Sequence, residues 1–393
     1  METPACYTHA KMSAPGIEIE LPCSKSIALR ALTLRYSTGL DIPLHGMTPC
    51  KDIDEMERGL RLLAGAHEGD RIRIVISEGA APFRFLTALA ASTPGVKSMI
   101  IPGNRLAERP IGQLVEALRR AGAEITLLRD GILDITGRKI AGGMVEIDNS
   151  ISSQFESALL LASPLWERGL SLPEPDLREP SAPYRMMTRR MLDIFKSHPD
   201  SFLIEGDWSA ASYFFEARMI AAAMGRTLRF SFPSLGPAAE SLQGDSRIAD
   251  FTEEIMATVG VFTADMRSTP DLVPALAVGC AISGKGFRFS GTANLRHKES
   301  DRIEALAMEL GRLGYRLDIS EENGTTISCD GVRRRATNGN ITINPHGDHR
   351  MAMAFAMAKT AIPDVIIETP GVVEKSFPGF WQETAKIPQL STT

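Results

Sequence analysis

Residues 348–361 have the sequence DHRMAMAFAMAKTA, in which small and apolar side chains occupy every face of a helix. A helix that is apolar all around is expected to be buried on all sides. It opens with Asp348, His349 and Arg350, where the first backbone N–H groups need partners. Asp348 is expected to cap the helix. Because the cation of Arg350 opposes the helix dipole, we expect an anion in front of it.

Five more segments share this composition, and they alternate along the chain with six amphipathic segments. The six apolar segments begin near Ser26, Pro82, Ser152, Ser209, Thr269 and Asp348. The amphipathic segments span 52–63, 109–121, 184–195, 247–259, 302–313 and, more weakly, 377–387. A regular alternation of this kind indicates an internal repeat.

Short runs of β-branched or alternating apolar residues lie between these helices and indicate strands. They cover 72–76, 98–101, 124–128, 144–147, 228–232, 286–290, 325–328, 341–343 and 365–368. The pattern predicts six strand–helix–strand–helix units, and hence an α/β protein. A division into three and three units is favoured near residues 241–245, although the pattern allows other places.

Length and composition describe an ordinary globular protein. The chain has 393 residues and 44% hydrophobic residues, which suggests two domains. Its net charge of -5 argues against a nucleic-acid partner. The five cysteines lack C-x-x-C spacing, so neither a disulfide framework nor a zinc site is indicated. No signal peptide is apparent and no apolar run reaches the roughly 18 residues of a membrane span, so we expect a cytoplasmic enzyme and no membrane partner.

Polar residues open the other buried helices as well. If these helix ends converge on a cleft, their dipoles and donors form an anion site in a protein that is acidic overall. The residues concerned are Lys25, Ser26, Arg30, Arg84, Ser152, Ser153, Gln154, Ser209 and Asp271. Each has a simpler alternative. The serines can act as helix caps, which is the preferred role for Ser209, and Arg30 can direct its charge to solvent. Lys375, taken alone, is expected at the surface.

The run Lys298-Glu299-Ser300-Asp301-Arg302 places two cations and two carboxylates beside a helix start. This arrangement suits chemistry on an anion. The simpler interpretation is a solvated first turn with Ser300 or Asp301 as its cap.

Nine motifs in one order make the chain resemble the 3-phosphoshikimate 1-carboxyvinyltransferase (EPSP synthase) family of enolpyruvate transferases. They are LPCSKSI (21–27), ERPIG (108–112), SSQF (152–155), EGDWS (205–209), QGD (243–245), PD (270–271), KESDR (298–302), DHRMAM (348–353) and KSFP (375–378). The resemblance extends from Ile17 to Trp381.

The resemblance implies two similar domains, each with three βαβαββ-like repeats around buried parallel helices, an inside-out α/β barrel. The expected domains are 21–242 and the discontinuous 1–20 plus 243–393, with the active site in the cleft between them. It also implies transfer of the carboxyvinyl group of phosphoenolpyruvate to the 5-hydroxyl of 3-phosphoshikimate, with release of phosphate. No metal or organic cofactor is expected, and we expect a monomer.

The resemblance assigns roles to individual residues. Asp271 is the candidate base and Glu299 the candidate proton carrier, with Lys25 or Lys375 as partner. The 3-phosphoshikimate site would comprise Lys25, Ser26, Arg30, Ser152, Ser153, Gln154, Ser181, Tyr184, Asp271, Asn294 and Lys298. The phosphoenolpyruvate site would comprise Lys25, Ala80, Arg109, Gln154, Arg302, Arg350 and Lys375.

Two motifs depart from the family pattern. Cys23 replaces a usual glycine, and we interpret it as a small packing residue. Ala80, Ala81 and Pro82 stand where the family has glycine, threonine and alanine, so an added methyl group shortens the phosphoenolpyruvate pocket. The expected result is either poor inhibition by glyphosate or weaker binding of phosphoenolpyruvate.

Two other functions compete with this one. The related carboxyvinyltransferase that acts on UDP-N-acetylglucosamine usually has cysteine or aspartate five residues before the Arg-Pro pair, where this chain has Asn104. A non-catalytic binding protein of the same fold is the other alternative, because the glycine–threonine pair is lost. The retained charged residues oppose it.

Overall fold

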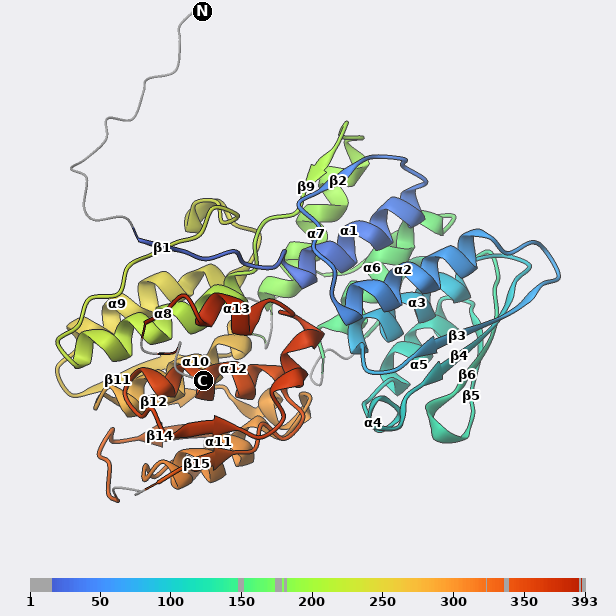
Figure 1. The fold of residues 1–393 in the computed structure, drawn as a ribbon. Coiled ribbons are helices and arrows are strands. Elements are labelled where there is room, and N and C mark those ends of the chain that lie inside the picture. The colour runs from blue at the N-terminus through green and yellow to red at the C-terminus, as the bar shows by residue number, and fades with distance from the viewer. Residues whose placement is uncertain are drawn as a thin grey trace, which may run out of the picture.

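The computed structural model describes residues 16–147, 152–173, 179, 182–322, 324–335, 339–388 and 390. The described chain forms two hydrophobic cores. In Figure 1 the elements coloured blue to green lie on one side and those coloured yellow to red on the other, with the N-terminal strand β1 on the second side. The mixed α/β fold that the repeat pattern predicted is confirmed.

The first core surrounds three helices that are apolar on nearly every face, and three amphipathic helices cover them. The buried helices are α1 (Lys25–Thr38), α3 (Ala80–Ala91) and α6 (Gln154–Ala162). The covering helices are α2 (Lys51–Ala64), α5 (Gly112–Arg120) and α7 (Ala182–Lys196), and the short α4 spans Asn104–Ala107. The buried helices contact one another, as expected for helices without a polar face.

The second core repeats this arrangement. Its buried helices are α8 (Trp208–Ala223), α10 (Val273–Ile282) and α12 (His349–Met357). Its amphipathic helices are α9 (Ile248–Ala257), α11 (Arg302–Arg312) and the short α13 (Phe380–Thr384). Gly279 lets α8 and α10 approach closely, because a Cβ atom there would lie 2.4 Å from Met219 Cε. All six buried and all six amphipathic helices were predicted, with ends that differ by a few residues.

The strands of the described chain form six sheets, three for each half. In the first half, β3 (Arg71–Ile76), β4 (Lys97–Pro102), β6 (Leu133–Thr136) and β5 (Glu124–Leu127) lie in this order, beside the pairs β2 (Leu44–His45)–β9 (Phe202–Leu203) and β7 (Gly143–Met144)–β8 (Leu170–Ser171). In the second half, β11 (Val261–Asp265), β12 (Gly286–Ser290), β14 (Thr326–Cys329) and β13 (Asp318–Ser320) lie in this order, beside β1 (Ile17–Glu18)–β10 (Phe230–Ser231) and β15 (Ile341–Ile343)–β16 (Val365–Ile367). In both four-stranded sheets the first pair is parallel and the others are antiparallel.

Seven of these strands were not predicted: β1, β2, β6, β8, β9, β11 and β13. Four of them, β1, β2, β8 and β9, have only two residues, which is too short to show an alternating pattern. Their strand character comes from the partner strand and not from their own sequence.

Helix capping was predicted correctly at two of three positions. The Asp348 side chain accepts a hydrogen bond from the backbone N–H of Arg350 at 2.9 Å, and Asp301 caps α11. The expected cap at Ser209 is wrong. Asp207 caps α8, and the Ser209 hydroxyl donates to the Asp245 carboxylate instead, because Ser209 is already the second residue of the helix.

The two cores divide the chain at a different point from the predicted domains. The last buried residue of the first core is Ile204. The second core contains Ile19 and Leu21 and then continues from Trp208, so α8 belongs to the second core. We propose that the domain boundary lies near residue 206 instead of 242. The reason is packing: the apolar faces of α8 are covered by α10 and α12.

Two short segments join the halves and are hydrogen-bonded to each other. The Ser24 N–H donates to the Glu205 carbonyl at 2.8 Å, and the Asp207 N–H donates to the Pro22 carbonyl at 2.9 Å. Both chain crossings therefore lie side by side. Within the described residues, no helix is both long and apolar enough to cross a membrane.

One buried carboxyl group should limit the stability of the second core. Both oxygens of Glu216 in α8 are buried and have no hydrogen-bond partner in the described part of the chain. Burial raises the pKa of Glu216 well above its usual value. In the unfolded chain the group ionises above about pH 4.3, so it favours the unfolded state increasingly as the pH rises.

We therefore expect Glu216→Leu to raise the free energy of unfolding by about 1–3 kcal/mol at pH 5, and by more at pH 8. Urea denaturation at both pH values measures this, with Glu253→Gln on the exposed face of α9 as the control. If the substitution raised the free energy of unfolding equally at both pH values, the pKa of Glu216 would not be raised in the folded protein.

Candidate active site

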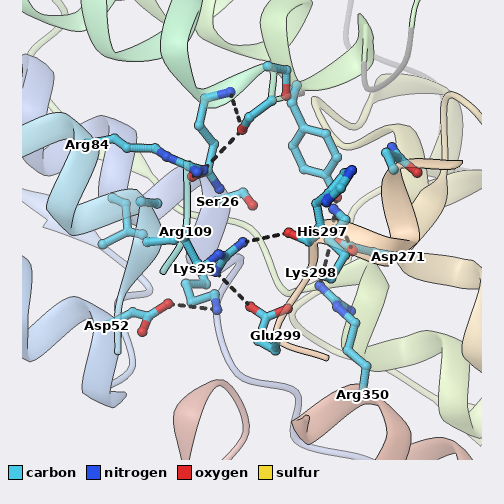
Figure 2. Close-up of a pocket in the computed structure, with 18 of the residues that line it drawn as sticks. Lys25, Ser26, Asp52, Arg84, Arg109, Asp271, His297, Lys298, Glu299 and Arg350 are labelled. Carbon is cyan, nitrogen blue, oxygen red and sulfur yellow. Dashed lines mark hydrogen bonds and ion pairs between the residues drawn. The ribbon is translucent and has the colours of Figure 1, made fainter. Parts of the chain in front are cut away.

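A pocket between the two halves collects nearly all of the predicted site residues. Its lining comprises Lys25, Ser26, Leu29, Arg30, Asp52, Ala80, Ala81, Arg84, Arg109, Pro110, Ser152, Ser153, Gln154, Tyr184, Asp271, Asn294, His297, Lys298, Glu299, Arg302, His349 and Arg350. Figure 2 shows Lys25, Arg84 and Arg109 of the first half facing Asp271 and Lys298 of the second. Of the predicted residues, Lys375 lies just beyond this lining, and Ser181 falls outside the described residues.

Lys25 stands at the first position of α1, where a buried helix start faces the pocket. Its Nζ lies 2.9 Å from Asp52 Oδ2. Burial lowers the pKa of Lys25, but the Asp52 carboxylate outweighs burial and keeps the pKa above its usual value. Lys25 is therefore a permanent cation. Asp52 was not predicted as a site residue, and the available signal was an aspartate at the start of the predicted helix 52–63.

Arg30 does not direct its charge to solvent, so that alternative is wrong. The side chain is 3% exposed, because α1 is surrounded by other helices. Its guanidinium donates to Thr188 Oγ1 at 2.7 Å, to Ser157 Oγ at 3.2 Å and to the Ser26 carbonyl at 2.8 Å. The cation is thus held by neutral oxygens at the floor of the pocket and keeps an uncompensated charge.

Arg84 in α3 organises one wall of the pocket. It donates to Ser152 Oγ at 3.0 Å, to Gln154 Oε1 at 2.6 Å and to the Pro110 carbonyl at 2.9 Å. Burial, together with the nearby charge of Arg109, lowers the pKa of Arg84. Arg84 was noted only as a helix-opening residue. In the structure Arg84 lines the pocket and orients the side-chain amide of Gln154.

Asp271 is the anion that faces Arg350. It accepts from Arg350 at 3.0 Å and from Arg302 at 2.9 Å, and the Lys298 Nζ lies 3.5 Å away. The hydroxyl of Tyr184, from the first half, donates to it at 3.0 Å. Burial raises the pKa of Asp271, but these cations outweigh burial and hold the pKa well below its usual value.

Glu299 is the second carboxylate at the centre of the pocket. Its Oε2 accepts from Arg302 at 2.9 Å, and its Oε1 lies 3.5 Å from Lys375 Nζ and 3.8 Å from Arg109 NH1. Burial raises the pKa of Glu299, but Lys375, Arg302 and Arg109 outweigh it and hold the pKa well below the usual range. The plain interpretation of Lys375 as a surface lysine is wrong, since its side chain is buried between the halves.

Arg302 links the carboxylates of the second half. The side chain is 1% exposed, and besides Asp271 and Glu299 it binds Asp348 Oδ2 at 2.7 Å. Asp348 caps α12 at the same time, so it has a role in both the helix and the site. The interpretation of residues 298–302 as a solvated turn is therefore wrong for Arg302, which is buried. Its other part, that Asp301 caps the helix, is confirmed.

His349 lines the pocket but was not predicted as a site residue. Both ring nitrogens are buried without a hydrogen-bond partner among the described residues. Burial and the charge of Lys25 lower the pKa of His349 well below its usual value. The imidazole is therefore neutral. Its position between Asp348 and Arg350 was the signal that could have identified it.

The pocket carries a clear excess of positive charge. Seven side chains of its lining are cations (Lys25, Arg30, Arg84, Arg109, Lys298, Arg302 and Arg350), against three carboxylates (Asp52, Asp271 and Glu299). Within the described residues, no cluster of three or more histidine, cysteine or acidic side chains could hold a metal ion. The site can therefore bind polyanions through side chains, and it offers two carboxylates for proton transfer.

Relatives of known name match almost the whole chain. A family model described as EPSP synthase (3-phosphoshikimate 1-carboxyvinyltransferase) matches residues 16–384. A 3-phosphoshikimate 1-carboxyvinyltransferase of Bacteroides fragilis is 35% identical, over 95% of this chain and 97% of the relative. One of Cronobacter sakazakii is 31% identical, over 94% of this chain and 95% of the relative.

Solved structures agree with this fold. An EPSP synthase from Acinetobacter baumannii superposes with a TM-score of 0.65 at 19% identity, over 94% of this chain and 96% of that one. The enolpyruvyl transferase NikO from Streptomyces tendae also gives 0.65, at 13% identity, with 94% of each chain covered. At these identities the likeness concerns the fold alone. Together with the family match along the chain, these findings place the protein in the EPSP synthase (3-phosphoshikimate 1-carboxyvinyltransferase) family.

Proposed function

We propose that the protein transfers the carboxyvinyl group of phosphoenolpyruvate to the 5-hydroxyl of 3-phosphoshikimate and releases phosphate, as a step of the shikimate pathway. The observation that carries this proposal is the excess of cations around two partly buried carboxylates, Asp271 and Glu299. Both substrates are polyanions, and charge-assisted hydrogen bonds contribute roughly 1.5–3 kcal/mol each. The charge of the pocket therefore suits the substrates in an otherwise acidic protein.

The resemblance to the family divides the residues between the two substrates, and Lys25 and Gln154 belong to both sets. Arg30, Ser152, Ser153 and Tyr184 line the pocket on the first half, and we assign them to 3-phosphoshikimate together with Ser26, Asn294 and Lys298. Lys25, Arg109, Gln154, Arg302, Arg350 and Lys375 are assigned to phosphoenolpyruvate. Ala80 forms part of the wall beside them, at the start of α3.

The reaction requires three proton transfers. In the addition step the 5-hydroxyl oxygen bonds to carbon 2 of phosphoenolpyruvate, its proton leaves, and carbon 3 gains a proton. In the elimination step carbon 3 loses a proton and the bond between carbon 2 and the phosphate oxygen breaks. We propose that Asp271 accepts the proton of the 5-hydroxyl. We propose that Glu299 transfers the proton to and from carbon 3, with Lys25 and Lys375 as neighbouring cations.

The cations around these two carboxylates suggest how substrate binding makes the carboxylates reactive. Asp271 and Glu299 are each held ionised by several cations that we assign to the substrates. When substrate anions bind Arg302, Arg350 and Lys375, they compete for the same charges, and the pKa values of both carboxyl groups should rise toward the range useful for proton transfer.

The alternatives receive less support. Asn104 begins α4 and is exposed, so it does not supply the cysteine or aspartate expected of the UDP-N-acetylglucosamine enzyme. A binding protein without activity remains the second candidate, because Ala80 and Ala81 narrow the pocket. A cytoplasmic location and a monomeric state stay predictions.

The sharpest test is Glu299→Gln, which keeps the shape of the side chain and removes its capacity to carry a proton. We expect turnover, measured as phosphate release from 3-phosphoshikimate and phosphoenolpyruvate, to fall by about 10²–10⁴-fold. Binding of 3-phosphoshikimate, measured by calorimetry, should remain nearly unchanged. Glu304→Gln on the exposed side of α11 is the matched control.

Two results would contradict this assignment. Turnover within a few fold of the wild type would remove Glu299 from proton transfer. Absence of turnover in the wild type, with 3-phosphoshikimate still bound, would favour the binding protein.

A second prediction concerns the departure at Ala80. Its methyl group occupies the wall where the family has glycine, so a ligand longer than phosphoenolpyruvate should fit poorly. We expect weak inhibition by glyphosate, and Ala80→Gly should strengthen this inhibition and lower the KM for phosphoenolpyruvate. Ordinary micromolar inhibition of the wild type, competitive with phosphoenolpyruvate, would contradict the prediction. Steady-state kinetics with both ligands measure it.

A further inference from the structure

A buried carboxylate outside the predicted site binds the loop that precedes α3. Glu55 lies in α2 and is 2% exposed. Its Oε1 accepts from the Ser77 N–H at 2.8 Å, from the Glu78 N–H at 3.4 Å and from the Ser77 hydroxyl. Its Oε2 accepts from the Gly79 N–H at 3.0 Å. One side chain thus satisfies three successive backbone donors of residues 77–79.

The loop is shaped to receive this carboxylate. A Cβ atom on Gly79 would lie 2.6 Å from Glu55 Oε2, so the close approach requires glycine at this position. On the other side, a Cβ atom on Gly103 would lie 2.3 Å from the Ser77 carbonyl oxygen. Residues 77–79 are therefore fixed between α2 and the end of β4, and Ala80 follows directly as the first residue of α3.

The same loop reaches the second half of the protein. The Lys375 ammonium donates to the Glu78 carbonyl at 3.5 Å and lies 3.5 Å from the Glu299 carboxylate. A shift of residues 77–79 would move this carbonyl and the wall at Ala80 together. Ala80 and Lys375 belong to the part of the site that we assign to phosphoenolpyruvate.

We propose that Glu55 is a positioning residue for phosphoenolpyruvate. It holds residues 77–79 so that Ala80 forms the pocket wall and the Glu78 carbonyl holds the ammonium of Lys375 beside Glu299. The proposal rests on the proposed function for the identity of the ligand. The position of Glu55, away from the pocket lining, means that it acts only through the loop.

The test is Glu55→Gln, in which the amide group keeps the size of the carboxylate but turns one acceptor into a donor that faces N–H groups. We expect kcat/KM for phosphoenolpyruvate to fall about tenfold or more, as expected when charge-assisted hydrogen bonds are lost. The KM for 3-phosphoshikimate should stay within about twofold. Asp54→Asn removes one exposed charge from the same turn of α2 and should behave like the wild type.

Ser77→Ala provides a second, milder variant in case Glu55→Gln does not fold. It removes one donor to Glu55 and should lower kcat/KM for phosphoenolpyruvate in the same direction but less. The double variant should be no worse than Glu55→Gln alone, because both changes act on one contact. The proposal would be overturned if the losses in kcat/KM of the two single variants multiplied in the double variant. An equal rise of KM for both substrates would also overturn it.

Failure of the proposed function would appear differently. In that case the wild type itself would not turn over. The positioning role can then still be measured by calorimetric titration of inorganic phosphate in the presence of 3-phosphoshikimate. Glu55→Gln should weaken phosphate binding relative to Asp54→Asn, and equal binding by the two variants would overturn the role of Glu55.

Discussion

The guanidinium of Arg302 is the interaction on which the second half of the site depends. It is almost fully buried, and it contacts the carboxylates of Asp271, Glu299 and Asp348 at 2.7–2.9 Å. A buried cation is tolerated only where anions and hydrogen bonds compensate its lost hydration. Arg302 therefore holds the starts of three elements together: the turn before α10, the segment before α11, and the cap of α12. Movement of one of them would remove one of the three carboxylate partners of a buried cation.

The buried helices explain why so many charges gather in one place. A helix with no polar face cannot satisfy its first N–H groups with solvent, so its start must meet a cap or a ligand. Asp348 and Asp207 cap two of these helices internally. At α1 and α3 no side chain caps the first turn, and both starts line the pocket with Lys25 and Ala80. The architecture that buries the helices thus also builds an anion site.

The two halves are joined locally and meet again at the pocket. The paired crossings near Ser24 and Glu205 connect them at one edge. Across the cleft, Tyr184 donates to Asp271, and Arg109 lies beside Glu299. The catalytic carboxylates that we propose therefore receive partners from both halves, so the site exists only when the halves are together. This explains why its residues are spread along the chain from Lys25 to Lys375.

The sequence by itself determined the sixfold repeat, the class of every buried and amphipathic helix and, through the ordered motifs, most of the charged residues that line the pocket. These features depend on periodicity and residue type, which are local. It did not determine the two-residue strands, the assignment of α8 to the second core, the burial of Lys375, or the partners of Arg84 and Glu55. Those depend on contacts between residues far apart in the chain. A lysine or glutamate has the same local pattern whether it faces water or a partner, and only the tertiary structure decides which of these surrounds it.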